Sequence, residues 1–345
     1  MILVTGGTGL LGSHLLYELV RKRHKVIATR RYSSNLEEVK RIFAYYSPKA
    51  EELFDKICWV EADLENQVEV EGVLKGVDKV YHCAAMVSFQ PKERERMIGF
   101  NVRSTASVVN ACQATGIKKL LHVSSSSAIG RAPEGVLADE NMIWAYSKTS
   151  SGYAVSKFKS EMEVWRGIEE GLNAVIVNPT IIFGPGFWDR GSSSIFTRVS
   201  RGLRVSTPGV TGYVGVQDVV RAMIRLMDSD ISGERFIISE GNYSFTDIFR
   251  MIRGALWEYG KHPKNRQHIR TISRSTLQRI VHLDAFWGFL TGRRNITSDQ
   301  VLSAFSEVRF SNEKIRKAIG IEFKPVIEVI DQVAETFVKD RYGRR

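Results

Sequence analysis

The stretch that decides the fold is ILVTGGTGLLG, residues 2–12. A short apolar run leads into a glycine-rich turn, and an amphipathic segment follows over Leu10–Arg21. Glycines in such a turn allow a backbone conformation closed to side chains, close approach of a pyrophosphate, and tight packing of helix on strand. The helix that follows offers free N–H groups and its positive end to phosphates. The stretch therefore predicts a strand–turn–helix unit that binds a dinucleotide, with a plain structural turn as the alternative.

Further along the chain, short apolar runs alternate with longer amphipathic segments, as in βαβ units around a parallel sheet. This pattern predicts an α/β fold, a Rossmann doubly wound parallel sheet with a smaller, discontinuous C-terminal substrate lobe. The expected strands are Ile2–Thr5, Lys25–Thr29, Ile57–Ala62, Lys79–Cys83, Lys119–Ser124, Asn173–Val177 and Arg235–Ser239. The expected helices are Leu10–Arg21, Leu36–Tyr46, Glu93–Thr115, Gly152–Glu170 and Asp218–Met227.

Loop residues set the expected domain boundaries. Gly184-Pro185-Gly186, the serines at 192–194 and Thr207-Pro208-Gly209 interrupt the alternation after Val177. We therefore expect an NAD(P)-binding Rossmann domain over 1–185 plus about 213–240, and a substrate-binding lobe over about 186–212 plus 241–345.

Composition excludes several classes of protein. With 43% hydrophobic and 25% charged residues, the chain is neither disordered nor fibrous. Apolar runs reach only about five residues, whereas a membrane helix needs ~20, and no secretory signal is readable. Cys58, Cys83 and Cys112 have no metal-ligand spacing. We expect a cytoplasmic protein with buried, reduced thiols, no membrane span and no metal.

The net charge of +11 is a local feature. Residues 1–180 carry +2, whereas the stretch from Arg250 to Arg294 carries +8. A solvated basic face is the default interpretation. An anionic substrate, such as a nucleotide sugar or a CoA ester, is the functional alternative, and no nucleic-acid module is present. Membrane attachment through Leu277–Leu290 is less favoured than an ordinary lobe helix.

The end of the second expected strand bears on the choice of dinucleotide. An acidic residue there would bond the adenosine ribose, but the sequence reads ATRRYSS at 28–34. Arg30 and Arg31, with two serine hydroxyls, suit a 2′-phosphate, unless they are simply solvated loop charges. NADP(H) is therefore favoured, and NAD(H) remains possible.

A tyrosine and a lysine lie four residues apart in YAVSK, residues 153–157, on one face of an expected helix. Tyrosine ionises near pH ~10, so Tyr153 needs help to exchange protons at neutral pH. The Lys157 ammonium would stabilise the phenolate. The serine run 124–127 follows the fifth expected strand, where a hydroxyl could bond a reacting oxygen or merely satisfy loop backbone groups.

Together these motifs resemble an extended short-chain dehydrogenase/reductase of the NAD-dependent epimerase/dehydratase family. They occur in the family's order: TGGTGLLG at 5–12, Asp63-Leu64, HCAA at 82–85, NVRST at 101–105, SSSSAIG at 124–130, YAVSK at 153–157 and NPTIIFGPG at 178–186. ATRRYSS and NPTIIFGPG are closer to the dihydroflavonol reductase, cinnamoyl-CoA reductase and 3β-hydroxysteroid dehydrogenase branch than to UDP-galactose 4-epimerase. The stretch 36–56 departs from the pattern.

The resemblance implies roles for individual residues. Tyr153 would be the catalytic acid/base and Lys157 its partner, with Ser125 as the catalytic serine and Ser124 or Ser126 as alternatives. It also implies dimerisation through the expected helices Glu93–Thr115 and Gly152–Glu170. The implied cofactor-binding residues are Gly6, Thr8, Gly9, Leu10, Leu11, Gly12, Arg30, Arg31, Asp63, Leu64, Cys83, Ala84, Ala85, Asn101, Val123, Tyr153, Lys157, Val177, Pro179 and Thr180.

An NADPH-dependent carbonyl reductase is the function that these features favour. The main alternative is a nucleotide-sugar epimerase with tightly bound NAD. A dinucleotide-sensing regulator is a third, and Tyr153 and Lys157 disfavour it because such proteins tend to lack this pair. The sequence does not identify the substrate.

Overall fold

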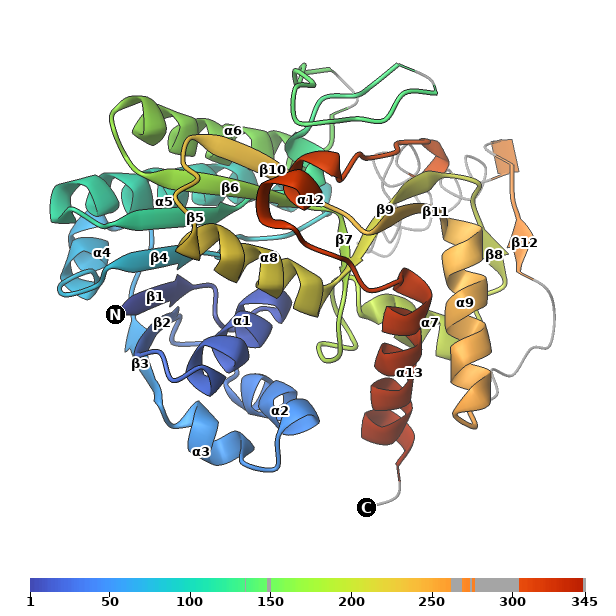
Figure 1. Cartoon of the computed structure of the whole chain (residues 1–345). Coiled ribbons are helices and arrows are strands. Elements are labelled where there is room, and N and C mark those ends of the chain that lie inside the picture. The colour runs from blue at the N-terminus through green and yellow to red at the C-terminus, as the bar shows by residue number, and fades with distance from the viewer. Residues whose placement is uncertain (134, 148–149, 262–268, 274, 277–303, 344–345) are drawn as a thin grey trace.

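The computed structural model describes residues 1–133, 135–147, 150–261, 269–273, 275–276 and 304–343. Its centre is a sheet of seven parallel strands in the order β10-β6-β5-β4-β1-β2-β3 (Figure 1). This order winds outward from β1 in both directions, so the predicted doubly wound fold is confirmed. The strands are β1 Ile2–Thr5, β2 Val26–Arg30, β3 Ile57–Glu61, β4 Lys79–His82, β5 Lys119–Val123, β6 Ala174–Pro179 and β10 Glu234–Ile238.

Helices cover both faces of this sheet (Figure 1). One face carries α1 (Leu10–Arg21), α2 (Glu37–Tyr46), α3 (Ala50–Phe54) and α8 (Val216–Asp228). The other carries α4 (Gln67–Val73), α5 (Arg94–Thr115) and α6 (Gly152–Glu169). All the predicted strands and helices are present within two residues at each end, because apolar residues at strand and helix spacing do face the two cores.

A smaller set of elements lies beside the carboxyl ends of β6 and β10. Three strands form its sheet in the order β11-β9-β7, and a separate apolar core joins them to three helices. A strand pair β8–β12 lies beside them, and the 3-10 turns η1 and η2 follow β4 and β5. The elements are β7 Ile181–Phe183, β8 Val205–Ser206, β9 Val210–Gly215, β11 Gly241–Ser244, β12 Arg270–Thr271, α7 Ser194–Ser200, α9 Phe245–Glu258, α12 Glu313–Ile319, α13 Val326–Tyr342, η1 Pro91–Glu93 and η2 Ser126–Ala128. The predicted division of the chain into two domains stays a prediction.

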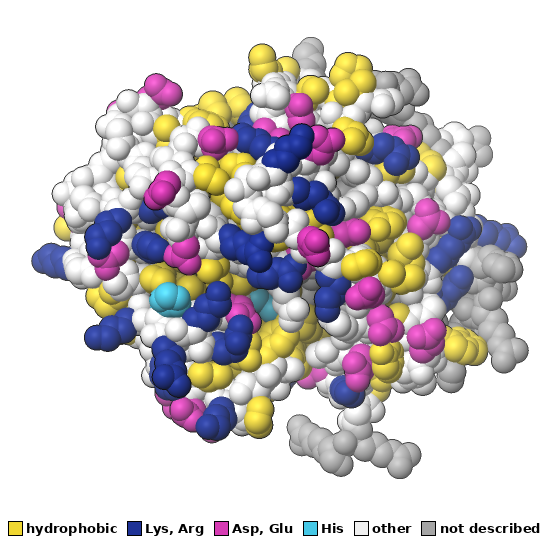
Figure 2. Space-filling view, viewed as in Figure 1, with side chains coloured by type: hydrophobic (Ala, Val, Ile, Leu, Met, Phe, Trp, Pro, Cys, Tyr) yellow, Lys and Arg dark blue, Asp and Glu magenta, His cyan; other side chains and the backbone are white. Residues whose placement is uncertain are grey.

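The charged surface shows no large patch of one sign on the face drawn in Figure 2, where basic and acidic side chains are interspersed. Leu277–Leu290 and much of the basic stretch lie outside the described residues. No helix in the described part of the chain is long and apolar enough to cross a bilayer.

The stretch 36–56, which sequence reasoning left unexplained, forms α2 and α3. Val39, Ile42 and Phe43 of α2 are buried, and the Phe43 ring packs edge-on against Tyr17 of α1 with centroids 5.3 Å apart. The segment therefore adds two helices to the layer that covers this face of the sheet near β2 and β3.

The three cysteines are free thiols, as expected. Cys112 is buried and Cys83 is partly exposed, but the expectation of burial is wrong for Cys58. Because β3 is an edge strand of the sheet, it is covered less completely than the central strands, and Cys58 is exposed.

Three histidines are buried in the large sheet and its helices. His82 and His122 occupy paired positions on β4 and β5, with ring centroids 5.3 Å apart. His82 contacts Thr5 Oγ1 at 2.8 Å, whereas both ring nitrogens of His122 lack a hydrogen-bond partner. Burial lowers the pKa of His14 to about 4 and of His82 to about 3. Burial also lowers the pKa of His122 well below its ordinary value. In the described residues, no group of three His, Cys, Asp or Glu could hold a metal ion.

Replacing His122 with leucine is expected to reduce the acid sensitivity of folding. Because its pKa is depressed in the folded state, the unfolded chain binds more protons below the unfolded pKa of ~6.5. Stability therefore falls as the pH drops through this window, by about 1.4 kcal/mol per unit for one histidine. Urea unfolding at pH ~7.5 and ~5.5 measures this loss of unfolding free energy. We expect the loss to be smaller in H122L than in the parent, because the titrating side chain is absent from the variant. An equal pH dependence in both proteins would contradict it. Exposed His24 provides the control H24L.

Candidate active site

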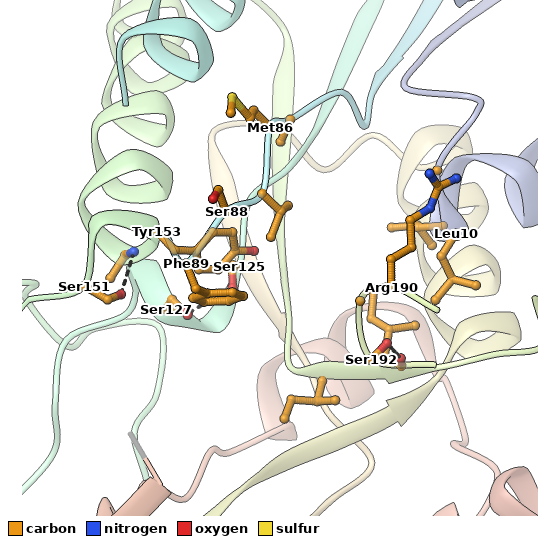
Figure 3. Close-up of a pocket in the computed structure, with 18 of the residues that line it drawn as sticks. Leu10, Met86, Ser88, Phe89, Ser125, Ser127, Ser151, Tyr153, Arg190 and Ser192 are labelled. Atoms are coloured by element: carbon orange, nitrogen blue, oxygen red, sulfur yellow. Dashed lines mark hydrogen bonds between the residues drawn. The ribbon is translucent and has the colours of Figure 1, made fainter. Parts of the chain in front are cut away.

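One cavity of about 2520 Å³ opens at the carboxyl ends of the parallel strands. The β1–α1 turn and the loops after β2, β4 and β5 form one side of it, and β7, α7 and α9 form the other. Figure 3 shows part of the cavity, with Ser125 and Tyr153 close together and Leu10 and Arg190 drawn away from them in the view. Such crevices are where open α/β sheets bind ligands.

The glycine turn has the shape of a phosphate cradle. Gly6 has φ +70°, and a Cβ there would lie 2.5 Å from the Ala84 backbone nitrogen. A Cβ on Gly12 would lie 2.2 Å from the Gly6 carbonyl oxygen, so helix and turn pack without side chains. Gly9 is exposed, and a Cβ on it would project into largely open space.

The N-terminus of α1 is left open toward the cavity. Gly9 is its N-cap residue, no side chain caps it, and no acidic residue lies in its first turn. Its first N–H groups and the positive end of its dipole therefore face the space beside Gly9 and Leu10. The residues at this turn fit the diphosphate of a dinucleotide.

The two arginines after β2 differ in their surroundings. Arg30 pairs with Glu61 at 2.7 Å on the neighbouring strand β3. Arg31 is exposed and lines the cavity, its backbone N–H donates to Ser34 Oγ at 3.1 Å, and the described residues place no carboxylate within ion-pair distance of it. Asp63 and Leu64 line the same end. Arg31 is thus the better placed of the two to meet an additional phosphate.

The candidate catalytic residues come together where the loop after β5 meets the first turns of α6. The Lys157 Nζ donates to the Val123 carbonyl at 3.0 Å, which joins α6 to the end of β5. The Ser125 Oγ accepts from the Ser127 N–H at 3.2 Å, and both Ser125 and Tyr153 line the cavity. Lys157 is buried behind them.

Electrostatics at these residues reflect burial. Burial raises the pKa of Tyr153 above its ordinary value, and its contact with the Ser125 side chain acts in the opposite direction. Burial lowers the pKa of Lys157 to about 8, and Cys83 and Glu161 oppose that shift. Lys157 is therefore close to its protonation midpoint at mildly alkaline pH, which makes it responsive to charge beside it.

Several residues assigned to cofactor binding by resemblance lie behind the cavity wall. Asn101 is buried and holds the loop after β4: its Oδ1 accepts from the Met86 N–H at 2.7 Å, and its Nδ2 donates to the Ser156 Oγ at 2.6 Å. The others that do not line the cavity are Gly12, Val123, Lys157, Val177 and Pro179, whereas Gly6, Thr8, Gly9, Leu10, Leu11, Cys83, Ala84, Ala85 and Thr180 line it. The roles of all these residues stay predictions.

Sequence reasoning missed a buried polar network behind the serine loop. The Glu161 carboxylate is fully buried and pairs with Arg235 Nη1 at 2.9 Å. It also accepts from Ser124 Oγ at 2.6 Å and from Asn178 Nδ2 at 2.8 Å, and the same Asn178 nitrogen donates to the Ser125 carbonyl at 3.1 Å. The available signal was the spacing of Glu161, four residues after Lys157 on one helix face. Arg235, its partner on β10, has no comparable spacing signal in the sequence.

Apolar side chains line the cavity on both sides of the candidate catalytic residues. The Phe89 ring lies 5.8 Å from the Tyr153 ring between centroids. Further apolar lining comes from Ile143, Trp144, Ile195, Leu203, Val205, Val210, Phe245, Phe249, Ile272, Val308 and Phe310, and the basic side chains among the lining include Arg96, Arg131 and Arg198.

The fold and the glycine turn define a doubly wound α/β protein of the dinucleotide-binding type. A model of the NAD dependent epimerase/dehydratase family matches residues 2–239, and the chain belongs to this family. The resemblance drawn from the motifs is thereby confirmed, and the protein is an enzyme of the extended short-chain dehydrogenase/reductase type.

Relatives of the chain include reductases. It is 29% identical over 272 residues to sterol demethylase protein B of Methylococcus capsulatus, covering 76% of each chain. It is 28% identical over 271 residues to dihydroflavonol 4-reductase of Solanum lycopersicum, covering 74% of this chain and 69% of that one. Among solved structures, UDP-glucose 4-epimerase of Thermotoga maritima superposes with a TM-score of 0.74 at 22% identity, over 98% of this chain and 99% of that one. The structural likeness shows the shared fold.

Proposed function

We propose that the protein is an NADP(H)-dependent carbonyl reductase that works through Ser125, Tyr153 and Lys157. The observation that carries the proposal is the convergence of Ser125 and Tyr153 on one cavity with the open glycine turn, with Lys157 fixed behind them. The relatives whose names include dihydroflavonol 4-reductase support reduction over epimerisation.

Each residue has a role that its position permits. The bound cofactor would supply a hydride from its nicotinamide to the substrate carbonyl carbon. The Tyr153 hydroxyl would donate the proton to the carbonyl oxygen, and the Ser125 hydroxyl would donate a hydrogen bond to the same oxygen. The Lys157 ammonium would stabilise the phenolate that remains, because opposite charges nearby favour the ionised form.

The lining of the cavity favours a substrate whose carbonyl is attached to an apolar body. Phe89, Ile143 and Trp144 come from the loops beside Tyr153, and Phe245 and Phe249 come from α9. Burial of apolar surface would supply most of the binding energy, and Arg131 or Arg198 could pair with an anionic group such as that of a CoA ester.

The experiment that tests this function is turnover of purified protein with NADPH on ketones, CoA thioesters and nucleotide sugars, followed by loss of NADPH fluorescence. Consumption of NADPH in proportion to alcohol product supports a reductase. Purified protein that already contains NAD, and interconverts sugar nucleotides without net cofactor consumption, would instead establish the epimerase. Substrate classes found in thermal-shift screening would direct the assay.

Replacing Arg31 with alanine is expected to weaken NADPH binding by about ten-fold, because a charge-assisted phosphate contact is lost. Binding of NADH, which has no 2′-phosphate, should change less than about two-fold. Titration of cofactor fluorescence measures both dissociation constants. Equal effects on the two cofactors, or none on NADPH, would refute the assignment of Arg31. R21A is the control, since Arg21 is an ion-paired arginine of α1 outside the cavity lining.

We also propose a cytoplasmic homodimer, as the family resemblance implies. The α5 and α6 helices that the resemblance points to are packed against each other on one face of the sheet. Light scattering during size-exclusion chromatography would give the mass in solution, and a monomer would exclude the dimer.

A further inference from the structure

We propose that Arg190 is a ligand of the cofactor diphosphate, held opposite the α1 N-terminus by a segment that crosses from the smaller sheet to α2. We call this segment, residues 186–191, the strap. The proposal rests on dinucleotide binding by this family, and it does not require that the reaction be a carbonyl reduction.

The strap connects parts of the molecule that are far apart in the sequence. Arg190 forms an ion pair with Glu38 of α2. At the start of the strap, a Cβ on Gly186 would lie 3.0 Å from the Ile42 side chain, so the backbone packs directly on α2. This contact gives the 36–56 stretch a function that its sequence did not reveal: α2 receives the strap.

The other side of the strap is fastened to α13. The Trp188 Nε1 donates to Asp340 Oδ2 at 2.6 Å, and Asp189 pairs with Arg341. Trp188 is buried against Phe337, with ring centroids 5.0 Å apart. The strap is therefore held between α2 and α13. Within it, the guanidinium of Arg190 lies 4.6 Å from the centroid of the Phe187 ring.

Backbone strain marks the same place. Phe187 has φ +54°, one of two described non-glycine residues in the left-handed region, and Gly186 before it has φ +101°. The left-handed conformation is strained for a bulky residue, and such strain is concentrated at functional clamps. The strained turn forms part of the cavity wall, and Phe187, Asp189 and Arg190 are all among the lining residues.

Arg190 faces the part of the cavity that suits a diphosphate. Arg190, Gly9 and Leu10 line the same cavity, and Figure 3 draws the side chains of Arg190 and of Leu10, the first residue of α1, away from Tyr153 in the view. Backbone N–H groups at α1 would bind the diphosphate from one side, and a guanidinium would neutralise its charge from the other. Arginine has five donors, so it can contact phosphate oxygens and Glu38 together.

Binding of NADPH and NADH to the purified protein, measured by cofactor fluorescence without substrate, tests the proposal. The R190A variant should raise both dissociation constants by about ten-fold or more and to a similar extent, because both cofactors share the diphosphate. The R31A variant should affect NADPH alone, so the two arginines are distinguished. No change in R190A, or a change confined to NADPH, would overturn the proposal.

A second variant separates ligand binding from bracing of the strap. E38Q removes the ion pair but keeps the Arg190 charge, so we expect both dissociation constants to stay within about two-fold of the parent. If E38Q weakened binding as much as R190A, Arg190 would act only by bracing, and the proposal would be wrong. R21A controls for loss of one exposed arginine. These measurements need no turnover. The Arg190 proposal can therefore be overturned while the reductase function stands, and the reductase function can be overturned while the Arg190 proposal stands.

Discussion

Replacing Tyr153 with phenylalanine is expected to lower kcat by about 100- to 10,000-fold, the range of a lost general acid. The change removes one oxygen atom from a ring that packs near Phe89, so the fold and the cavity should be preserved. Cofactor binding is expected to change little, because the hydroxyl would act on the substrate oxygen. Single-turnover kinetics with a saturating ketone and NADPH would measure the loss at the chemical step.

The control for this prediction is Tyr146→Phe, which removes the same atom from a tyrosine that is exposed and outside the cavity lining. We expect that variant to keep the parent kcat. Full turnover in Y153F on a substrate reduced by the parent protein would show that Tyr153 is not the proton donor. Loss of NADPH binding in Y153F would instead place the hydroxyl on the cofactor.

The fold could be predicted closely because its signals are local. Near-continuous apolar runs such as Leu120–Val123 and Ala174–Val177 are typical of strands covered on both faces, and both are fully or almost fully buried. The glycine turn was predictable for the same reason, since its steric requirement lies within residues 6–12. The strands β7 and β9 of the smaller sheet gave no such signal, because their pairing depends on segments far apart in the chain.

The candidate site was predicted only in part, for a related reason. Ser125, Tyr153 and Lys157 belong to motifs whose spacing is visible along the chain. Arg190 and Glu38 are 152 residues apart, and no pattern in either segment relates one to the other. Charge alone did not find them either, because the strongest basic stretch of the sequence lies elsewhere.

The buried pair of Arg235 and Glu161 is the same kind of long-range contact, and its loss is expected to have the largest effect on stability. Arg235→Met would leave the Glu161 carboxylate fully buried without its counter-charge. Breaking a buried ion pair on one side costs about 3–5 kcal/mol. The remaining bonds from Ser124, Asn178 and the Trp165 indole reduce this cost without removing it, since none of these donors carries a charge. Urea unfolding at neutral pH would measure the loss.

A double-mutant cycle shows whether the pair acts as a unit. Glu161→Gln keeps an acceptor oxygen for Ser124 and Asn178 but removes the charge. The loss of unfolding free energy in the Glu161→Gln/Arg235→Met protein should therefore be about 1–3 kcal/mol smaller than the sum of the losses in the two single variants. The exposed pair of Arg309 and Glu307 gives the matched control, Arg309→Met, with an expected cost below about 1 kcal/mol. Additive single effects, or an Arg235→Met cost no larger than the control, would contradict the prediction. Because the neutral amide oxygen of Glu161→Gln accepts more weakly from Asn178, which also bonds the Ser125 carbonyl, a folded Glu161→Gln protein should lose more in kcat than in cofactor affinity. That difference would identify the network as a positioning device for the serine loop, since a change that merely loosened the fold would weaken both.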